Sequence, residues 1–163
     1  MLFRSGGPDL SRRTIENLLG SKIDYYVATT TQGLKGLVDM LGGVYLVVEK
    51  DMRYTDRRGG LYINLKASPE KQLLNGEEAE QYVRFRHDAH GDSGYQIKNG
   101  KKVPAGRVVR QQKFMRALAN RVLSLPRTER FSVLQKARDK EFIVSDMQMS
   151  DWKGLMDILK DFD

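Results

Sequence analysis

Two kinds of apolar spacing alternate along this chain, and the alternation limits the fold more than any other feature of the sequence. Apolar residues recur every three or four positions in 9–19, 31–41 and 107–123, as the buried stripe of a helix does. Short apolar or alternating runs at 44–48 and 61–65 have the spacing of β-strands instead. Helices and strands in alternation are typical of α/β proteins, so we predict an α/β fold.

Local signals set the expected limits of the other elements. The helix that begins near Glu77 is expected to give way to extended chain by Tyr82, because residues 82–87 alternate in polarity. The continuous apolar run at 44–48 indicates a strand that is covered on both faces. We also expect a strand at 24–30, a loop at 52–60, and a hairpin at 95–103 with a type I′ turn at Asn99-Gly100.

The helices have further expected features. N-terminal caps are expected at Asp9, Thr31 and Ser150, and further helices at 128–139 and 150–162. In the 107–123 helix, the residues expected to face inward are Val108, Met115, Leu118 and Val122.

Length and composition exclude several classes of protein. The 163 residues suit one domain, and the 40% of apolar residues lies in the range of soluble globular proteins. The uncharged runs are too short and too polar for a transmembrane helix, and no apolar signal-peptide segment follows Met1. The absence of cysteine excludes a disulfide scaffold, a thiol nucleophile and a cysteine-ligated zinc site.

The net charge of +7 comes from one segment. Residues 93–127 contain nine basic residues and no acidic one, whereas the rest of the chain has 19 basic and 21 acidic residues. Such a segment favours an anionic partner, that is, a phosphate, a nucleic acid or an anionic membrane surface. The alternative is a basic helix face that is only solvated. We do not favour nucleic acid, because the segment holds only Tyr95 and Phe114 as aromatics and no recognition motif.

Arginines on either side of this segment's start form a candidate binding site. In extended chain Arg84 and Arg86 point to the same side, because side chains alternate along it. Arg107 and Gln111 are one helical turn apart and share a face of the next helix. Guanidinium groups gathered at one place suit a pyrophosphate, and the free N–H groups of a first helical turn also favour an anion. The candidate substrate-binding residues are Arg84, Arg86, Arg107 and Arg110; the alternative is that they pair with surface carboxylates.

Two aspartates, Asp88 and Asp92, lie in the loop beside these arginines. Oxygen ligands next to a phosphate site suit Mg²⁺, which is usually held by one or two carboxylates together with substrate phosphate. Asp88 or Asp92 is therefore the candidate metal ligand. The alternative is that both aspartates form turns or pair with arginines.

Four stretches of the chain resemble, in order, the later part of a LytR-CpsA-Psr (LCP) domain, also called the cell-envelope-related transcriptional attenuator domain. They cover roughly residues 6–125 and read GGPDLSRRTIENLLG, IDYYVATTTQGLKGLVDMLGG, LYINLKASPEKQLLNGEEAEQYVRFR and GRVVRQQ. The resemblance implies a three-layer α-β-α sandwich with a mixed central sheet.

The resemblance also implies a function. LCP proteins are phosphotransferases of cell wall biogenesis that work outside the cytoplasmic membrane and are associated with it. They transfer a glycopolymer from a polyprenyl-pyrophosphate carrier to peptidoglycan, with arginines that grip the pyrophosphate and aspartates that hold Mg²⁺. By this resemblance the catalytic residues are Arg84, Arg86, Asp92, Arg107 and Gln111.

The chain departs from the family pattern in two ways. An insert at 93–105 separates the loop aspartate from Arg107, so Asp88 stays an alternative to Asp92. The family's domain normally begins with a further half that supplies other site residues, so 1–125 is expected to be the later part of a catalytic domain and 126–163 to be helices packed on it. Whether this chain is itself an enzyme therefore stays open; the alternative is an inactive fragment, or a module that binds nucleic acid or an anionic polymer without catalysis.

Overall fold

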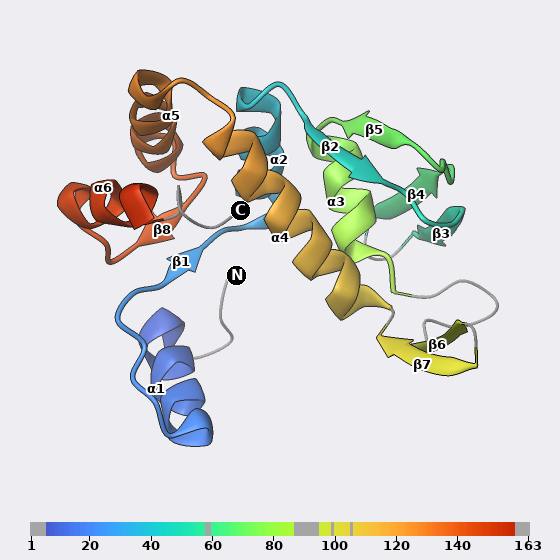
Figure 1. Ribbon diagram of the computed structural model, residues 1–163, viewed down its shortest axis with the longest axis horizontal. Coiled ribbons are helices and arrows are strands. Elements are labelled where there is room, and N and C mark those ends of the chain that lie inside the picture. Colours follow the sequence, from blue (N-terminus) through green and yellow to red (C-terminus); the bar gives the residue numbers. More distant parts are fainter. Residues whose placement is uncertain (1–5, 58–59, 87–94, 99, 105, 159–163) are drawn as a thin grey trace. The chain divides into compact units, whose positions relative to one another are not determined.

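The computed structural model divides the chain into two compact units, which are described separately here. The terminal unit combines Met1–Leu34 with Leu125–Asp163, and the central unit is Lys35–Ser124 (Figure 1). The structure describes residues 6–57, 60–86, 95–98, 100–104 and 106–158. The predicted aspartates Asp88 and Asp92, and Asn99 of the predicted turn, lie outside these ranges.

The terminal unit contains helices from both ends of the chain. Its elements are α1 (Gly7–Leu19), β1 (Val27–Ala28), α5 (Arg127–Asp139), β8 (Val144–Ser145) and α6 (Met149–Ile158). β1 and β8 pair antiparallel, and the unit's buried apolar residues include Ala137, Ile143 and Trp152. The strand predicted at 24–30 is thus only two residues long, and β8 is absent from the sequence-based expectation.

Helix α1 differs from its expectation at its start and on its apolar side. Gly6, not Asp9, is the N-cap residue, and Pro8 lies in the first turn, where a missing N–H costs no hydrogen bond. The C-terminal cap Gly20 has φ of 65°, as predicted for a glycine that ends a helix. No residue of α1 is buried, and Leu18 is 82% exposed.

Helices α2 and α6 also begin differently from the prediction. α2 spans Thr31–Met40, and the Oγ1 of Thr30, rather than Thr31, accepts a hydrogen bond of 2.9 Å from the N–H of Gly33. In α6, Ser150 lies inside the helix, and Asp151 Oδ2 instead accepts a 2.7 Å bond from the N–H of Gln148.

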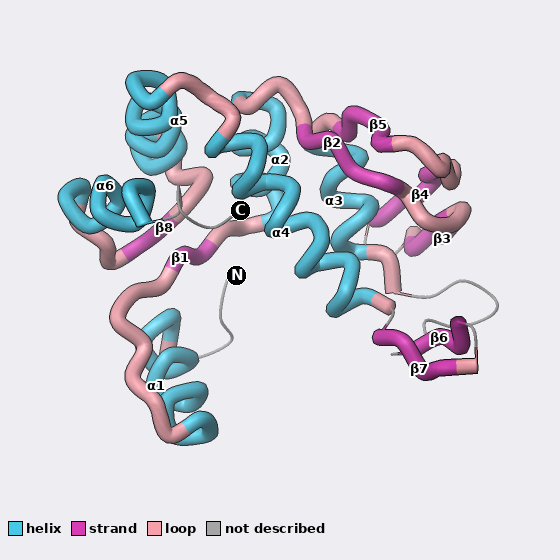
Figure 2. Tube along the Cα trace, viewed as in Figure 1, coloured by secondary structure: helices cyan, strands magenta, loops and turns pink. Residues whose placement is uncertain are grey.

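The central unit contains the other strands, most of α2 and two further helices (Figure 2). Its elements after α2 are β2 (Val44–Val47), β3 (Met52–Asp56), β4 (Leu61–Leu65), β5 (Lys71–Leu74), α3 (Gly76–Arg84), β6 (Tyr95–Lys98), β7 (Lys101–Pro104) and α4 (Arg107–Leu123). β2 pairs with β5, β3 with β4 and β6 with β7, all antiparallel. Figure 1 shows α4 running beside β2, and α3 packs on β4.

The predicted α/β class is confirmed by this mixture of helices and strands. In the described part of the chain, pairing is confined to two-stranded antiparallel ladders, so the parallel pairing that a mixed sheet needs is not seen there. The loop predicted at 52–60 is wrong, because its first five residues form β3. Met52 is fully buried and pairs with Leu65, so tertiary contacts override the polar character of the segment.

Strand β2 is covered on one face only, which corrects the expectation of a strand buried on both. Val44 and Leu46 are buried, whereas Tyr45 and Val47 are 55% and 37% exposed. The buried face contributes to a core that also contains Val38, Ile63 and Phe114. The exposed face is therefore available to line a groove.

Helix α4 is the longest described helix, with 17 residues. Its buried stripe is Arg110, Phe114, Leu118 and Val122, whereas Val108 and Met115, which were expected to face inward, are 65% and 59% exposed. No helix in the described ranges is both long enough and apolar enough to cross a membrane.

Candidate anion-binding site at the junction of α3 and α4

Helix α3 brings Arg84 to its C-terminal end. Asn75 starts the helix with a capping box, in which its Oδ1 accepts from the N–H of Glu78 and Glu78 Oε2 accepts from the N–H of Asn75, both at 3.0 Å. The helix then continues through Arg84, so the expected change to extended chain at Tyr82 is wrong. Tyr82 is fully buried and lies three residues after the buried Ala79, which is helical rather than strand spacing.

A buried carboxylate holds the Arg84 side chain. Glu80 is only 6% exposed, and its Oε1 lies 2.5 Å from Nη1 of Arg84, one helical turn later. The other oxygen of Glu80 lies 3.2 Å from Nζ of Lys35, which also contacts Glu77 at 2.8 Å. Hydrogen bonds from Lys35 to Glu77 and Glu80 raise the pKa of Lys35. Arg84 therefore has a fixed direction, and 36% of its side chain is exposed.

Two side chains of α4 fasten the end of α3 to the beginning of α4. Nη2 of Arg110 donates to the carbonyl of Phe85 at 2.8 Å, and its guanidinium lies 5.1 Å from the centre of the Phe85 ring. Nε2 of Gln111 donates to the carbonyl of Val83 at 3.3 Å. We call this meeting of residues 83–86 with the first turns of α4 the α3–α4 junction.

The junction contains several of the predicted site residues. Arg84 ends α3, Arg86 follows it and is exposed, and Arg107 is exposed at the first position of α4. The N-cap Gly106 offers no side chain to the free N–H groups of that first turn, so they can face an anion. Arg110, also a candidate substrate-binding residue, is only 2% exposed, and its side chain binds the carbonyl of Phe85.

Tyr82 and Glu49 lie beside this arrangement and are absent from the sequence-based site. The Tyr82 hydroxyl donates to Oε2 of Glu49 at 2.9 Å, and Lys113 donates to the other carboxylate oxygen at 3.3 Å. Burial, and secondly the neighbouring Glu49 carboxylate, raise the pKa of Tyr82 above its ordinary value. Through these two bonds, Glu49, which follows β2, is joined to Tyr82 of α3 and to Lys113 of α4.

The carboxylates found here do not form a magnesium site. Within the described ranges, no three His, Asp or Glu side chains gather where they could hold a metal ion. Glu80 is engaged by Arg84 and Lys35, and Glu49 by Tyr82 and Lys113. The described residues therefore do not fit Mg²⁺, and we derive no chemical step through it.

One pattern in the sequence could have predicted the ion pair between Glu80 and Arg84. Glu80 and Arg84 are four residues apart with the acid first, which is the favourable order for an ion pair on a helix. The signal depends on α3 continuing to Arg84, which the alternating residues 82–87 concealed. Glu49 and Lys35 come from distant parts of the chain and carry no local signal.

Known proteins are similar to this chain. The LytR_cpsA_psr family matches residues 1–162. "Regulatory protein MsrR" of Staphylococcus aureus is 35% identical over 124 residues, which cover 75% of this chain and 32% of that protein. "Polyisoprenyl-teichoic acid--peptidoglycan teichoic acid transferase TagU" of Bacillus anthracis is 31% identical over 102 residues, which cover 59% of this chain and 29% of that protein.

Solved structures show the same relationship. The crystal structure of B. subtilis TagV matches with a TM-score of 0.72 and 27% identity, over 99% of this chain and 56% of that one. The chain spans about a third of the length of the curated relatives MsrR and TagU. Because the family match covers all but the last residue, the chain belongs to the LytR_cpsA_psr family.

Proposed function

We propose that this chain takes part in transferring a cell wall glycopolymer from a polyprenyl-pyrophosphate carrier to peptidoglycan. Membership of the family supports the general role, and the printed name of TagU describes such a transfer for teichoic acid. The observation that supports the proposal is the α3–α4 junction, where Gln111 and Arg110 bind the carbonyls of Val83 and Phe85. These bonds join the segment that contains Arg84 and Arg86 to the first turns of α4, which begins at Arg107. We also propose that the protein works at the outer face of the membrane, as the family resemblance implies.

In the proposed reaction, a sugar hydroxyl of the acceptor attacks a phosphorus of the lipid-linked pyrophosphate. A new O–P bond forms, the bond from that phosphorus to the bridging oxygen breaks, the hydroxyl proton is released to solvent, and the prenyl phosphate leaves. Negative charge grows on the phosphate oxygens during this step, and fixed cations stabilise it. Arg84, oriented by Glu80, and the exposed Arg86 and Arg107 would bind those oxygens, while Gln111 holds the C-terminal end of α3, which carries Arg84 and leads into Arg86.

A binding measurement tests this role directly. We expect Arg84→Ala combined with Arg86→Ala to weaken the binding of farnesyl pyrophosphate, measured by calorimetry, by at least about tenfold, because charged hydrogen bonds contribute roughly 1.5–3 kcal/mol each. The matched control is Arg127→Ala with Arg138→Ala, which removes two exposed arginines of α5. Equal affinities of the two double variants for farnesyl pyrophosphate would contradict the site.

A further inference from the structure

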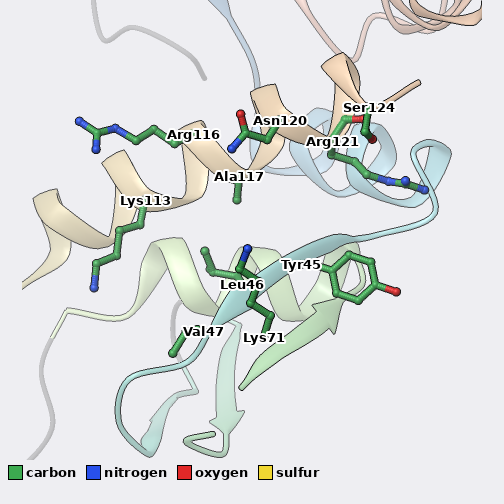
Figure 3. Close-up of a pocket in the computed structure, with 10 residues that line it drawn as sticks. All are labelled: Tyr45, Leu46, Val47, Lys71, Lys113, Arg116, Ala117, Asn120, Arg121 and Ser124. Atoms are coloured by element: carbon green, nitrogen blue, oxygen red, sulfur yellow. The ribbon is translucent and has the colours of Figure 1, made fainter. Parts of the chain in front are cut away.

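A groove of about 590 Å³ lies between α4 and the exposed face of β2, inside the central unit (Figure 3). In the figure α4 runs along one side and β2 along the other. The described lining residues are Tyr45, Leu46 and Val47 of β2, Lys71 of β5, Lys113, Arg116, Ala117, Asn120 and Arg121 of α4, and Ser124 after it. The groove is separate from the α3–α4 junction, because none of the junction's arginines lines it.

The charges along this groove have one sign. Lys71, Lys113, Arg116 and Arg121 line it, and none of its described lining residues is acidic. The three cations of α4 lie within roughly 140° around the helix axis, because about 100° per residue places Arg116 roughly 60° to one side of Lys113 and Arg121 roughly 80° to the other. From Lys113 to Ser124 the face is about 16 Å long at 1.5 Å per residue, which is enough to meet more than one negative group of an extended ligand.

Two of the cations bind other described residues, and the other two are exposed. Arg121 donates from Nε and Nη2 to the carbonyl of Leu41 at 3.0 and 2.8 Å, which fixes it at one end of the groove. Lys113, at the other end, contacts Glu49 and extends toward β2 in Figure 3. Arg116 extends outward from the helix in the same view, and Lys71 is exposed on β5.

Between the cations the groove offers apolar and aromatic surface. Tyr45 is 55% exposed and Val47 37% exposed, and Ala117 of α4 faces them across the groove. Sugar rings and polyol chains can pack on such surface while their phosphates reach the cations around it. The chemistry therefore fits a ligand that alternates uncharged hydroxyl-bearing units with phosphodiesters.

We propose that this groove binds the phosphodiester-linked chain of the glycopolymer, as a second subsite beyond the pyrophosphate site. This inference rests on the proposed function, which supplies the class of polymer. A prenyl chain fits the groove less well, since it carries no negative group that could meet the cations of the lining. Single-stranded nucleic acid also fits less well, because successive bases need successive aromatic platforms, and Tyr45 is the only aromatic residue among the described lining residues.

The test uses two ligands that each engage only one subsite. The first is poly(glycerol phosphate) without lipid or pyrophosphate, and the second is farnesyl pyrophosphate, which has no polymer. Lys71→Ala with Arg116→Ala should weaken polymer binding about tenfold at low salt and reduce its salt dependence, because two phosphate contacts are lost. The same variant should bind farnesyl pyrophosphate as the wild type does.

The matched control is Lys66→Ala with Arg53→Ala, which removes one lysine and one arginine that are exposed in the central unit and do not line the groove. All four positions are exposed, so circular dichroism should show unchanged folding. Equal loss of polymer binding in the two double variants, or none in either, would overturn the groove assignment. Equally tight binding of oligo(dT) with the same number of phosphates would overturn the polymer assignment. Failure of the proposed function would appear separately, as farnesyl pyrophosphate binding that does not depend on Arg84 and Arg86.

Discussion

At the scale of single residues, two hydrogen bonds define the α3–α4 junction: Arg110 donates to the carbonyl of Phe85, and Gln111 donates to that of Val83. The grouping of Arg84, Arg107 and Gln111 in one site stays a prediction from the sequence, because the structure pairs Arg84 with Glu80. The sequence did not predict that Arg110 is buried, because that depends on Phe85, which lies 25 positions away in the sequence. Local spacing cannot reveal the contact between Arg110 and Phe85, since the spacing of apolar residues does not show which other segment packs on the helix.

Tyr82 gives a prediction at this scale. Its pKa is raised in the folded protein, whereas in the unfolded chain a tyrosine ionises near pH 10, so the native state holds the proton longer. The stability from Tyr82 is therefore complete below about pH 10 and is lost as the pH rises above that value. At pH 11 the loss should be about 1.4 kcal/mol relative to pH 8, seen in urea unfolding as a shrinking advantage of the wild type over Tyr82→Phe. An advantage that is the same at both pH values would show that Tyr82 ionises equally in the folded and unfolded states.

At the scale of elements, the long helices and the strands β2, β4, β6 and β7 were predicted well, whereas β3, β5 and β8 were missed. The predicted helix at 107–123 coincides with α4, and the predicted hairpin at 95–103 matches β6 and β7 within one residue. β3 and β5 were missed because residues such as Arg53 and Gln72 pair with partners that lie beyond the reach of a local pattern. The end of α3 was predicted too early because its capping box and the Glu80–Arg84 pair outweigh the alternation of residues 82–87.

The link between α2 and α3 gives a prediction about burial. Glu77 and Glu80 of α3 both contact Lys35 of α2, but the Glu77 side chain is 61% exposed and the Glu80 side chain only 8%. Glu80→Gln should lower the free energy of unfolding by about 1–2 kcal/mol, because it removes two ion pairs of a buried carboxylate. Glu77→Gln, the matched control, should cost less than about 0.5 kcal/mol, since its pair is screened by water. Urea unfolding measures both, and equal losses would mean that burial does not set the strength of these pairs.

At the scale of the whole molecule, length and alternation predicted the α/β class but not the division of the chain. The terminal unit joins residues 27–28 with 144–145 through the pairing of β1 with β8, a contact between opposite ends of the sequence. Such long-range pairing leaves no trace in local spacing, and neither does the choice of partners in the other ladders. The site is more local, because every described residue of the α3–α4 junction lies in the central unit.

The central claim is that the exposed arginines of the α3–α4 junction bind pyrophosphate. The most direct measurement follows the Nε–Hε resonances of the arginine side chains by ¹H–¹⁵N NMR while inorganic pyrophosphate is added, with assignments from single Arg→Lys variants. The resonances of Arg84, Arg86 and Arg107 should shift together along one binding curve, while those of the exposed Arg127 and Arg138 of α5 stay in place. Equal shifts at Arg127 and Arg138, or no shift at Arg84, Arg86 and Arg107, would contradict the claim.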